Sequence, residues 1–268
     1  MIDLSKATFI IPIRIESNDR LRNVITTTAF LLENFDTNII IKEVDTESIF
    51  RRDALPILNN ILDVDVNVRH IFEYSDDPTF YRQRVLNEMI MKTDTEVVVN
   101  YDCDAILPLK SYELAYRGIL DGVYDVVYPY GRGQYQYQVK QSDEIVSSFL
   151  QTLDYEVLKQ NSNIHDSEFG WVQFFNRDVY IKGGMENENF KAYAPEDKER
   201  FYRFTTLGYN VGRIDDSIYH LEHDRGFNSW FSNPHMQSNM NEWEMLQRMS
   251  KEELIHYYST QKYLKKYQ

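Results

Sequence analysis

The sequence predicts one α/β domain built around a mostly parallel central sheet with helices on its faces. Short runs of β-branched and other apolar residues at 8–13, 38–44 and 96–101 are typical of buried strands. Segment 21–35 places apolar residues at helical spacing between the first two of these runs. A strand, a helix and a second strand at this spacing form a βαβ unit, and its two strands should therefore be parallel.

The alternation of strands and helices continues along the chain and weakens in the second half. Further helices are expected at 51–62, 80–92, 112–120, 145–159 and 195–207, and further strands at 66–72, 125–130, 170–180 and 209–212. Segment 131–139, rich in Gly, Tyr and Gln, is expected to be a loop or hairpin. No internal repeat and no change in composition marks a linker, so we interpret residues 1–268 as one domain.

Composition argues against several classes of protein. The formal net charge of −13 opposes binding to nucleic acid, because an acidic surface repels phosphates. Cys103 is the only cysteine, so no intrachain disulfide can form. No apolar run is long enough to span a bilayer, and residues 1–6 lack the order of a signal peptide. We expect a cytoplasmic enzyme, with weak membrane-surface contact conceivable only through the basic, aromatic segment 262–267.

Two carboxylates follow a predicted strand directly, in Asp102-Cys103-Asp104. In open α/β sheets, ligands bind beyond the carboxyl ends of the strands. Clustered carboxylates there repel each other unless they share a cation, and oxygen ligands suit Mg²⁺ or Mn²⁺, which can bridge to a diphosphate. The alternative is a solvated turn, since Asp-x-Asp triplets are common.

A histidine pair lies far downstream, in His220-Leu221-Glu222-His223. Two imidazoles three residues apart can face one metal from a helical turn or a tight loop. Imidazole suits Mn²⁺ better than Mg²⁺, and Zn²⁺ would also accept it. A lone histidine pair is more often structural, whereas with Asp104 the pair would form a mixed oxygen and nitrogen shell.

Glu196 and Asp197 stand at the start of the helix expected at 195–207. Acidic residues in a first helical turn commonly complement the helix dipole. The alternative is that one of them is a general base, which must lie within hydrogen-bond reach of an attacking hydroxyl. The local pattern leaves both interpretations open.

Taken in order, these motifs resemble the β-1,4-galactosyltransferase family, whose members are inverting glycosyltransferases with the Rossmann-like GT-A fold. The ordered set is more specific than any single motif. The segments that carry the resemblance are Phe9-Ile10-Ile11-Pro12-Ile13-Arg14, Phe80-Tyr81-Arg82-Gln83-Arg84-Val85-Leu86-Asn87, Asp102-Cys103-Asp104, Gly183-Gly184-Met185, 196–203 and His220-Leu221-Glu222-His223-Asp224-Arg225.

The resemblance implies a reaction and its catalytic groups. The reaction would be metal-dependent, inverting transfer of a hexose from a UDP-sugar to a hydroxyl of a glycan, lipid-linked or protein acceptor. Galactose or N-acetylgalactosamine is favoured, and glucose is the second choice. Asp104, His220 and His223 would hold Mn²⁺, with Mg²⁺ as the alternative. Asp197 would be the general base, and Glu196 would hold the donor sugar or the acceptor.

The resemblance also implies a nucleotide-sugar site. Its residues would be Pro12, Arg14, Phe80, Arg82, Asp102, Gly184 and Arg225. Asp45, near the end of the second expected strand, is a further candidate as a partner of a uracil N–H, unless it only caps the following turn. On this interpretation residues 1–108 form the nucleotide-binding half, residues 109–241 the acceptor and catalytic half, and residues 242–268 a helical tail.

The sequence departs from the family in the segment that shapes the sugar and acceptor pocket. Lys198 stands where the family has a third acid, and Tyr193-Ala194-Pro195 replaces its Trp-Gly-Trp-Gly-Gly segment, so the identity of both sugars stays open. A nucleotide-sugar-binding module without turnover is one alternative. A nucleotidyltransferase is another, which the absence of glycine from 14–18 disfavours.

Overall fold

The structure is a computed structural model that describes the chain except for residues 64–65, 67, 166–168, 194, 230–232 and 268. Strands and helices alternate in its first half. The elements there are β1 (Ile2–Ile13), α1 (Asn18–Asn34), β2 (Phe35–Asp45), the π-helical turn η1 (Phe50–Ala54), α2 (Leu55–Leu62), β3 (Arg69–Tyr74), α3 (Arg82–Ile90), β4 (Val97–Tyr101), β5 (Ala105–Ile106), α4 (Leu109–Leu120) and β6 (Val126–Tyr128).

The second half has shorter strands and ends in helices. Its elements are η2 (Gly133–Tyr135), β7 (Gln136–Val139), α5 (Asp143–Thr152), α6 (Tyr155–Gln160), β8 (Ser162–Ile164), β9 (Val172–Asn176), α7 (Arg177–Lys182), α8 (Glu196–Leu207), β10 (Val211–Arg213), β11 (Ile218–Leu221), α9 (Met236–Leu246), α10 (Lys251–Thr260) and η4 (Leu264–Lys266).

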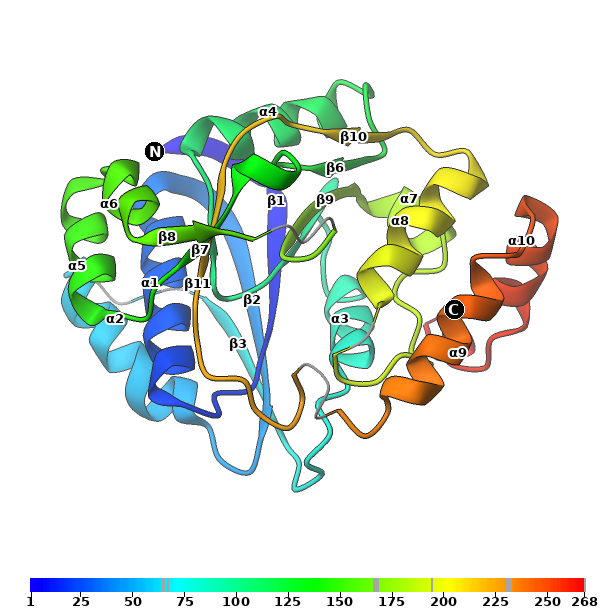
Figure 1. The fold of residues 1–268 in the computed structure, drawn as a ribbon, viewed down its shortest axis with the longest axis horizontal. Helices are drawn as coiled ribbons and strands as arrows, with labels where there is room; N and C mark the ends of the chain where they lie inside the picture. The colour runs from blue at the N-terminus through cyan, green and yellow to red at the C-terminus, as the bar shows by residue number, and fades with distance from the viewer. Residues whose placement is uncertain (64–65, 67, 166–168, 194, 230–232, 268) are drawn as a thin grey trace.

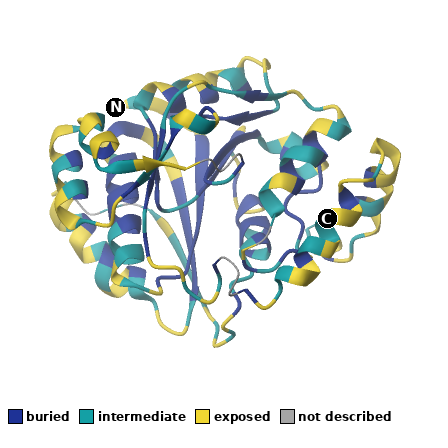
Figure 2. Cartoon of the chain, in the orientation of Figure 1, coloured by how far each residue is buried: buried dark blue, intermediate teal, exposed yellow. Residues whose placement is uncertain are grey.

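A central sheet of seven strands confirms the predicted fold class. Its order is β10-β6-β9-β4-β1-β2-β3; β9 runs antiparallel to β4 and β6, and the other neighbours in the sheet are parallel. Figure 1 shows α1 and α2 on one side of this sheet and α3 and α8 on the other. Helices therefore cover both faces, and the central strands are accordingly buried in Figure 2, as expected for a parallel sheet.

A second, smaller sheet was not expected from the sequence. Its order is β5-β11-β7-β8, and β11 pairs antiparallel with β5, so that His220 lies opposite Ala105. His220 is therefore on a strand, and the interpretation of 220–223 as a helical turn or a single tight loop is wrong. The four-residue strand carries too short a pattern to reveal its pairing.

Several expected elements are interrupted by local backbone features. The helix expected at 145–159 is two helices, because Leu153 adopts a left-handed conformation (φ 51°) after α5. The strand expected at 170–180 ends at Asn176, whose side chain accepts a hydrogen bond from Val179 N–H and caps α7. The loop or hairpin expected at 131–139 contains β7.

The C-terminal segment, expected to be helical from residue 242, contains the two helices α9 and α10. α9 begins at Met236, and a capping box of Ser250 and Glu253 starts α10. Both helices contact α8 (Figure 1), through an apolar cluster that includes Phe190 and Tyr258. Across the described residues, no helix combines the length and apolar character that crossing a membrane requires.

Candidate functional site

A cleft with about 1160 Å³ of empty space, part of it open to solvent, lies at the carboxyl ends of β1 and β4. Its walls come from the end of β1, the start of α3, the turn after β4, the start of α8, and β11 with the segment that follows it. The sequence-predicted residues that line it are Pro12, Arg14, Phe80, Arg82, Asp102, Asp104, Glu196, Asp197, His220, His223 and Arg225.

Asp45 and Gly184 do not line this cleft. The Asp45 carboxylate accepts a hydrogen bond from Thr46 N–H at 2.7 Å. Asp45 therefore caps the turn that follows β2, which was the alternative to a role in binding uracil. Gly184 has φ +95° and lies under Tyr258 of the tail, where an added Cβ would stand 2.6 Å from the ring. Gly184 thus permits close packing of α10.

Three proposed metal ligands, far apart in sequence, meet in the cleft. Asp104 Oδ2 lies 3.2 Å from His223 Nε2 and 3.6 Å from His220 Nε2, and all three side chains are buried. Two strand contacts create this arrangement: β5 pairs with β11, and Leu221 N–H donates to the Asp104 carbonyl at 2.7 Å.

Both imidazoles turn their Nε2 atoms toward Asp104 because their Nδ1 atoms have other partners. His220 Nδ1 lies 3.2 Å from Glu222 Oε1, and His223 Nδ1 lies 2.8 Å from the Asp224 carbonyl oxygen. Nδ1–H can donate to each of these oxygens, which leaves a lone pair on each Nε2. Outer partners of this kind orient metal-binding histidines in proteins.

The chemistry of this cluster fits a divalent cation. Metal bonds of about 2.0–2.2 Å at tetrahedral or right angles separate ligand atoms by roughly 2.8–3.6 Å, the range in which the two distances from Asp104 lie. Asp104 Oδ1 is buried and has no hydrogen-bond partner among the described residues. Despite burial, the two imidazoles hold the pKa of Asp104 well below its usual range. Although burial lowers it, Asp104 and Glu222 raise the pKa of His220 to about 9. The positive charge that this buried carboxylate needs can therefore come either from protonated His220 or from a cation that displaces its proton.

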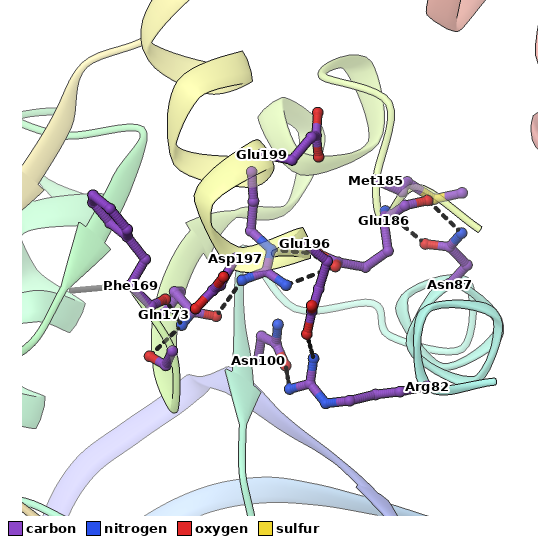
Figure 3. Close-up of polar contacts among 12 residues, drawn as sticks. Arg82, Asn87, Asn100, Phe169, Gln173, Met185, Glu186, Glu196, Asp197 and Glu199 are labelled. Carbon is purple, nitrogen blue, oxygen red and sulfur yellow. Dashed lines mark hydrogen bonds and ion pairs between the residues drawn. The ribbon is translucent and has the colours of Figure 1, made fainter. Parts of the chain in front are cut away.

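Glu196 and Asp197 enter the cleft from the first turn of α8 (Figure 3). Burial and the neighbouring Asp197 raise the pKa of Glu196 to about 8, and burial also raises the pKa of Asp197. Glu196 Oε1 lies 3.9 Å from Arg82 Nη1, whereas Glu196 Oε2 is buried with no hydrogen-bond partner among the described residues. The pair therefore holds a proton more readily than two solvated carboxylates would.

A buried arginine that was not predicted as a site residue lies beside these acids. Arg200 follows Glu196 by one helical turn and also lines the cleft. Its guanidinium donates to both carboxylate oxygens of Glu186, each at 2.7 Å, and to Gln173 Oε1 at 3.1 Å. Figure 3 shows Glu186 and Gln173 on either side of the start of α8. The i, i+4 spacing from Glu196 could have indicated that Arg200 shares a helix face with that acid. The hydrogen-bond partners of Arg200 could not be predicted in this way, because they come from distant segments.

Arg82 and Arg14 occupy the nucleotide side of the cleft. Arg82 forms an ion pair with Asp102 and donates to Asn100 Oδ1 at 3.3 Å. Arg14 Nε donates to the Val44 carbonyl at 2.8 Å, and the guanidinium lies 5.5 Å from the centre of the Phe80 ring. Arg14 Nη2 is buried without a hydrogen-bond partner among the described residues, so it can donate to a ligand.

One further cleft residue, Trp171, was not anticipated from the sequence. Trp171 has φ +65°, an unfavourable conformation for a bulky residue, and its ring packs 5.7 Å from that of His220. Arg225, which was anticipated, is 42% exposed at the rim and forms an ion pair with Glu222 at 2.6 Å. The strained backbone of Trp171 could not be predicted from the sequence, because only tertiary packing imposes it.

The Glu196 pKa predicts a pH-dependent contribution to stability. Its folded value of about 8 exceeds its ordinary 4.5, so this contribution is present below pH 4.5 and is lost as the pH rises toward 8. Between about pH 5 and 8, the melting temperature of the wild type should therefore fall relative to that of Glu196→Gln, which cannot ionise. Thermal denaturation across this range measures the difference. Glu252→Gln, at the exposed start of α10, is the control, and its melting temperature should change with pH as that of the wild type does. If the melting temperatures of all three proteins change with pH in the same way, the prediction is wrong.

Comparisons with known proteins support the fold and leave the family open. No protein-family model matches the sequence, and no curated protein sequence matches it. One solved structure with a similar fold is the mannosyltransferase PcManGT from Pyrobaculum calidifontis in complex with GDP-Man and Mn²⁺. It aligns with a TM-score of 0.54 and 12% identity, over 97% of this chain and 69% of that chain. The likeness is to a glycosyltransferase fold, and it does not single out the β-1,4-galactosyltransferases.

Proposed function

We propose that this chain is a divalent-metal-dependent glycosyltransferase that transfers a hexose from a nucleoside-diphosphate sugar to an acceptor hydroxyl. The observation that carries the proposal is the convergence of Asp104, His220 and His223 in one cleft with two carboxylates, Glu196 and Asp197. Cation ligands and a candidate base are the two parts that this reaction requires.

The metal would be held by Asp104, His220 and His223, with Mn²⁺ favoured over Mg²⁺ because two ligands are imidazoles. When bound, the cation offsets the negative charge that develops on the departing diphosphate. Arg14 lines the cleft and its Nη2 has no hydrogen-bond partner among the described residues, so it would donate to the nucleotide. Phe80, packed against Arg14, would border the same subsite.

Asp197 would accept the proton of the acceptor hydroxyl as that oxygen bonds to the anomeric carbon. The bond from this carbon to the diphosphate oxygen breaks in the same step, so one displacement inverts the configuration. Glu196 would bind a sugar hydroxyl, since its Oε2 has no other hydrogen-bond partner among the described residues. The dipole at the start of α8 favours an ionised Asp197, in opposition to its burial.

The donor is proposed to be a UDP-sugar, with galactose or N-acetylgalactosamine favoured and glucose second. This choice comes from the resemblance of the Arg14, Phe80–Asn87 and Asp102–Asp104 motifs to a UDP-sugar-dependent family. GDP-mannose is the alternative, because the structural neighbour was solved with it. The acceptor is proposed to be a glycan, lipid-linked or protein hydroxyl.

A nucleotide panel tests the proposed function. Thermal-shift titrations with UDP, GDP and CMP, each with and without Mn²⁺, should show stabilisation by UDP that requires Mn²⁺. A ligand at a hundred times its Kd raises stability by about 2.7 kcal/mol. Among the corresponding nucleotide sugars, the UDP-sugar should release its sugar fastest, and this release should also require Mn²⁺. Stabilisation by GDP but not by UDP would mean that the donor is a GDP-sugar rather than a UDP-sugar. If no nucleotide binds in a Mn²⁺-dependent way, the glycosyltransferase proposal is wrong. Binding without any turnover would favour the non-catalytic module.

A further inference from the structure

One buried asparagine on α1 contacts the segment that carries both histidines. The Asn23 side chain is fully buried, and its Nδ2 donates to the Leu221 carbonyl at 2.7 Å, with the Glu222 carbonyl at 3.5 Å. These two residues lie between His220 and His223 in the chain. A buried amide needs such partners, so the contact ties α1 to the end of β11.

The backbone of Leu221 is held from both sides, through its N–H and its carbonyl. Its N–H donates to the Asp104 carbonyl at 2.7 Å, and its carbonyl accepts from Asn23 at the same distance. One backbone unit thus connects the carboxylate ligand, the segment bearing the imidazoles, and α1. Displacing it would change the distances from Asp104 to both histidines.

Arg22 determines which way the Asn23 amide points. Asn23 Oδ1 accepts from Arg22 Nε at 3.2 Å and from Nη2 at 3.0 Å. Arg22 Nη2 also donates to the Glu222 carbonyl at 3.0 Å, and Asp19 holds Nη1 at 2.8 Å. Because the guanidinium has only donors, the amide oxygen faces it and the amide nitrogen faces Leu221.

We propose that Asn23 is a positioning residue for the metal site. It holds the His220–His223 segment at the separation from Asp104 at which one divalent cation can contact all three side chains. This inference rests on the metal site of the proposed function, but it concerns the assembly of that site rather than the reaction. Residues that orient metal ligands typically contribute 10–100-fold to metal affinity.

The structure offers a matched control on the same helix. Asn34 is also buried on α1, but its Nδ2 donates to the Phe30 carbonyl one turn earlier, at 2.8 Å. Asn23→Leu and Asn34→Leu each exchange a buried amide for an apolar group of similar size. A general effect of this exchange on α1 should therefore appear in both variants, whereas an effect on the metal site should appear only in Asn23→Leu.

Mn²⁺ binding, measured by the electron paramagnetic resonance signal of free Mn²⁺ without nucleotide, is the direct test. We expect the Mn²⁺ Kd to rise about 10–100-fold in Asn23→Leu and to change less than about threefold in Asn34→Leu. Asn23→Asp is the second variant, for use if Asn23→Leu does not fold. It can still accept from Arg22 but cannot donate to Leu221, so it should weaken binding similarly.

The outcomes separate this inference from the proposed function. Wild-type affinity in either folded Asn23 variant would overturn the positioning role while leaving the metal site intact. Equal losses in the Asn23 and Asn34 variants would also overturn it, because the effect would then be general to α1. If the wild type itself binds no Mn²⁺, the metal site fails and the inference fails with it.

Discussion

Asp104→Asn is expected to reduce metal-dependent glycosyl transfer by at least about 10³-fold. Asp104 is the only carboxylate among the three converging side chains of the described site. An amide would keep the shape of the side chain and remove the charge that holds the cation. Stabilisation of a leaving group by a metal ion is worth several kcal/mol, and about 1.4 kcal/mol corresponds to tenfold in rate. The measurement is kcat/KM with Mn²⁺, together with direct Mn²⁺ binding.

Asp36→Asn is the matched control for this prediction. Asp36 is an exposed residue near the start of β2 and does not line the cleft, so its charge can be removed without effect on the site. The control variant should keep wild-type kcat/KM and Mn²⁺ affinity. Full Mn²⁺-dependent turnover in Asp104→Asn would refute the assignment of Asp104 as a ligand.

Asp197→Asn is expected to lower kcat by about 10²–10⁴-fold, the usual contribution of a general base. Nucleotide affinity should be nearly unchanged, because the substitution removes proton acceptance and leaves Arg14 and the metal ligands in place. Steady-state kinetics and nucleotide binding separate these two quantities. The anomeric configuration of the product, observed by NMR early in the reaction, should be opposite to that of the donor.

Asp178→Asn tests whether the effect of Asp197 is only that of an acid in a first helical turn. Asp178 occupies the first turn of α7 and its side chain is 74% exposed. This control should retain wild-type kcat, since an exposed acid at a helix start contributes only to helix stability. Native turnover in Asp197→Asn, or a product that keeps the donor configuration, would show that the mechanism is wrong.

Much of the fold was predictable because it is encoded locally. The apolar runs of β1, β2 and β4 and the helical spacing in α1 indicate a parallel βαβ arrangement without reference to distant residues. The short elements of the second half were predicted less well. Strands of two to four residues, such as β5 and β11, depend on the neighbours with which they pair.

The sequence by itself determined the chemical groups of the site and their association with strand and helix ends. Asp102 and Asp104 follow a buried strand, and Glu196 and Asp197 start a helix, as the local pattern indicates. The two histidines were recognised as candidate ligands, but as parts of a turn. Their residue types carry chemistry wherever the fold places them, which is why they could be named in advance.

The tertiary structure alone decided which of these groups meet. The antiparallel register of β5 with β11 brings His220 to Asp104, and Asn23 of α1 holds the connecting peptide. The same packing turns Asp45 toward its own turn and places Gly184 under α10. Contacts between positions more than a hundred residues apart leave no local periodicity, because they depend on strand pairing and on hydrogen bonds that buried polar groups find only in the folded chain.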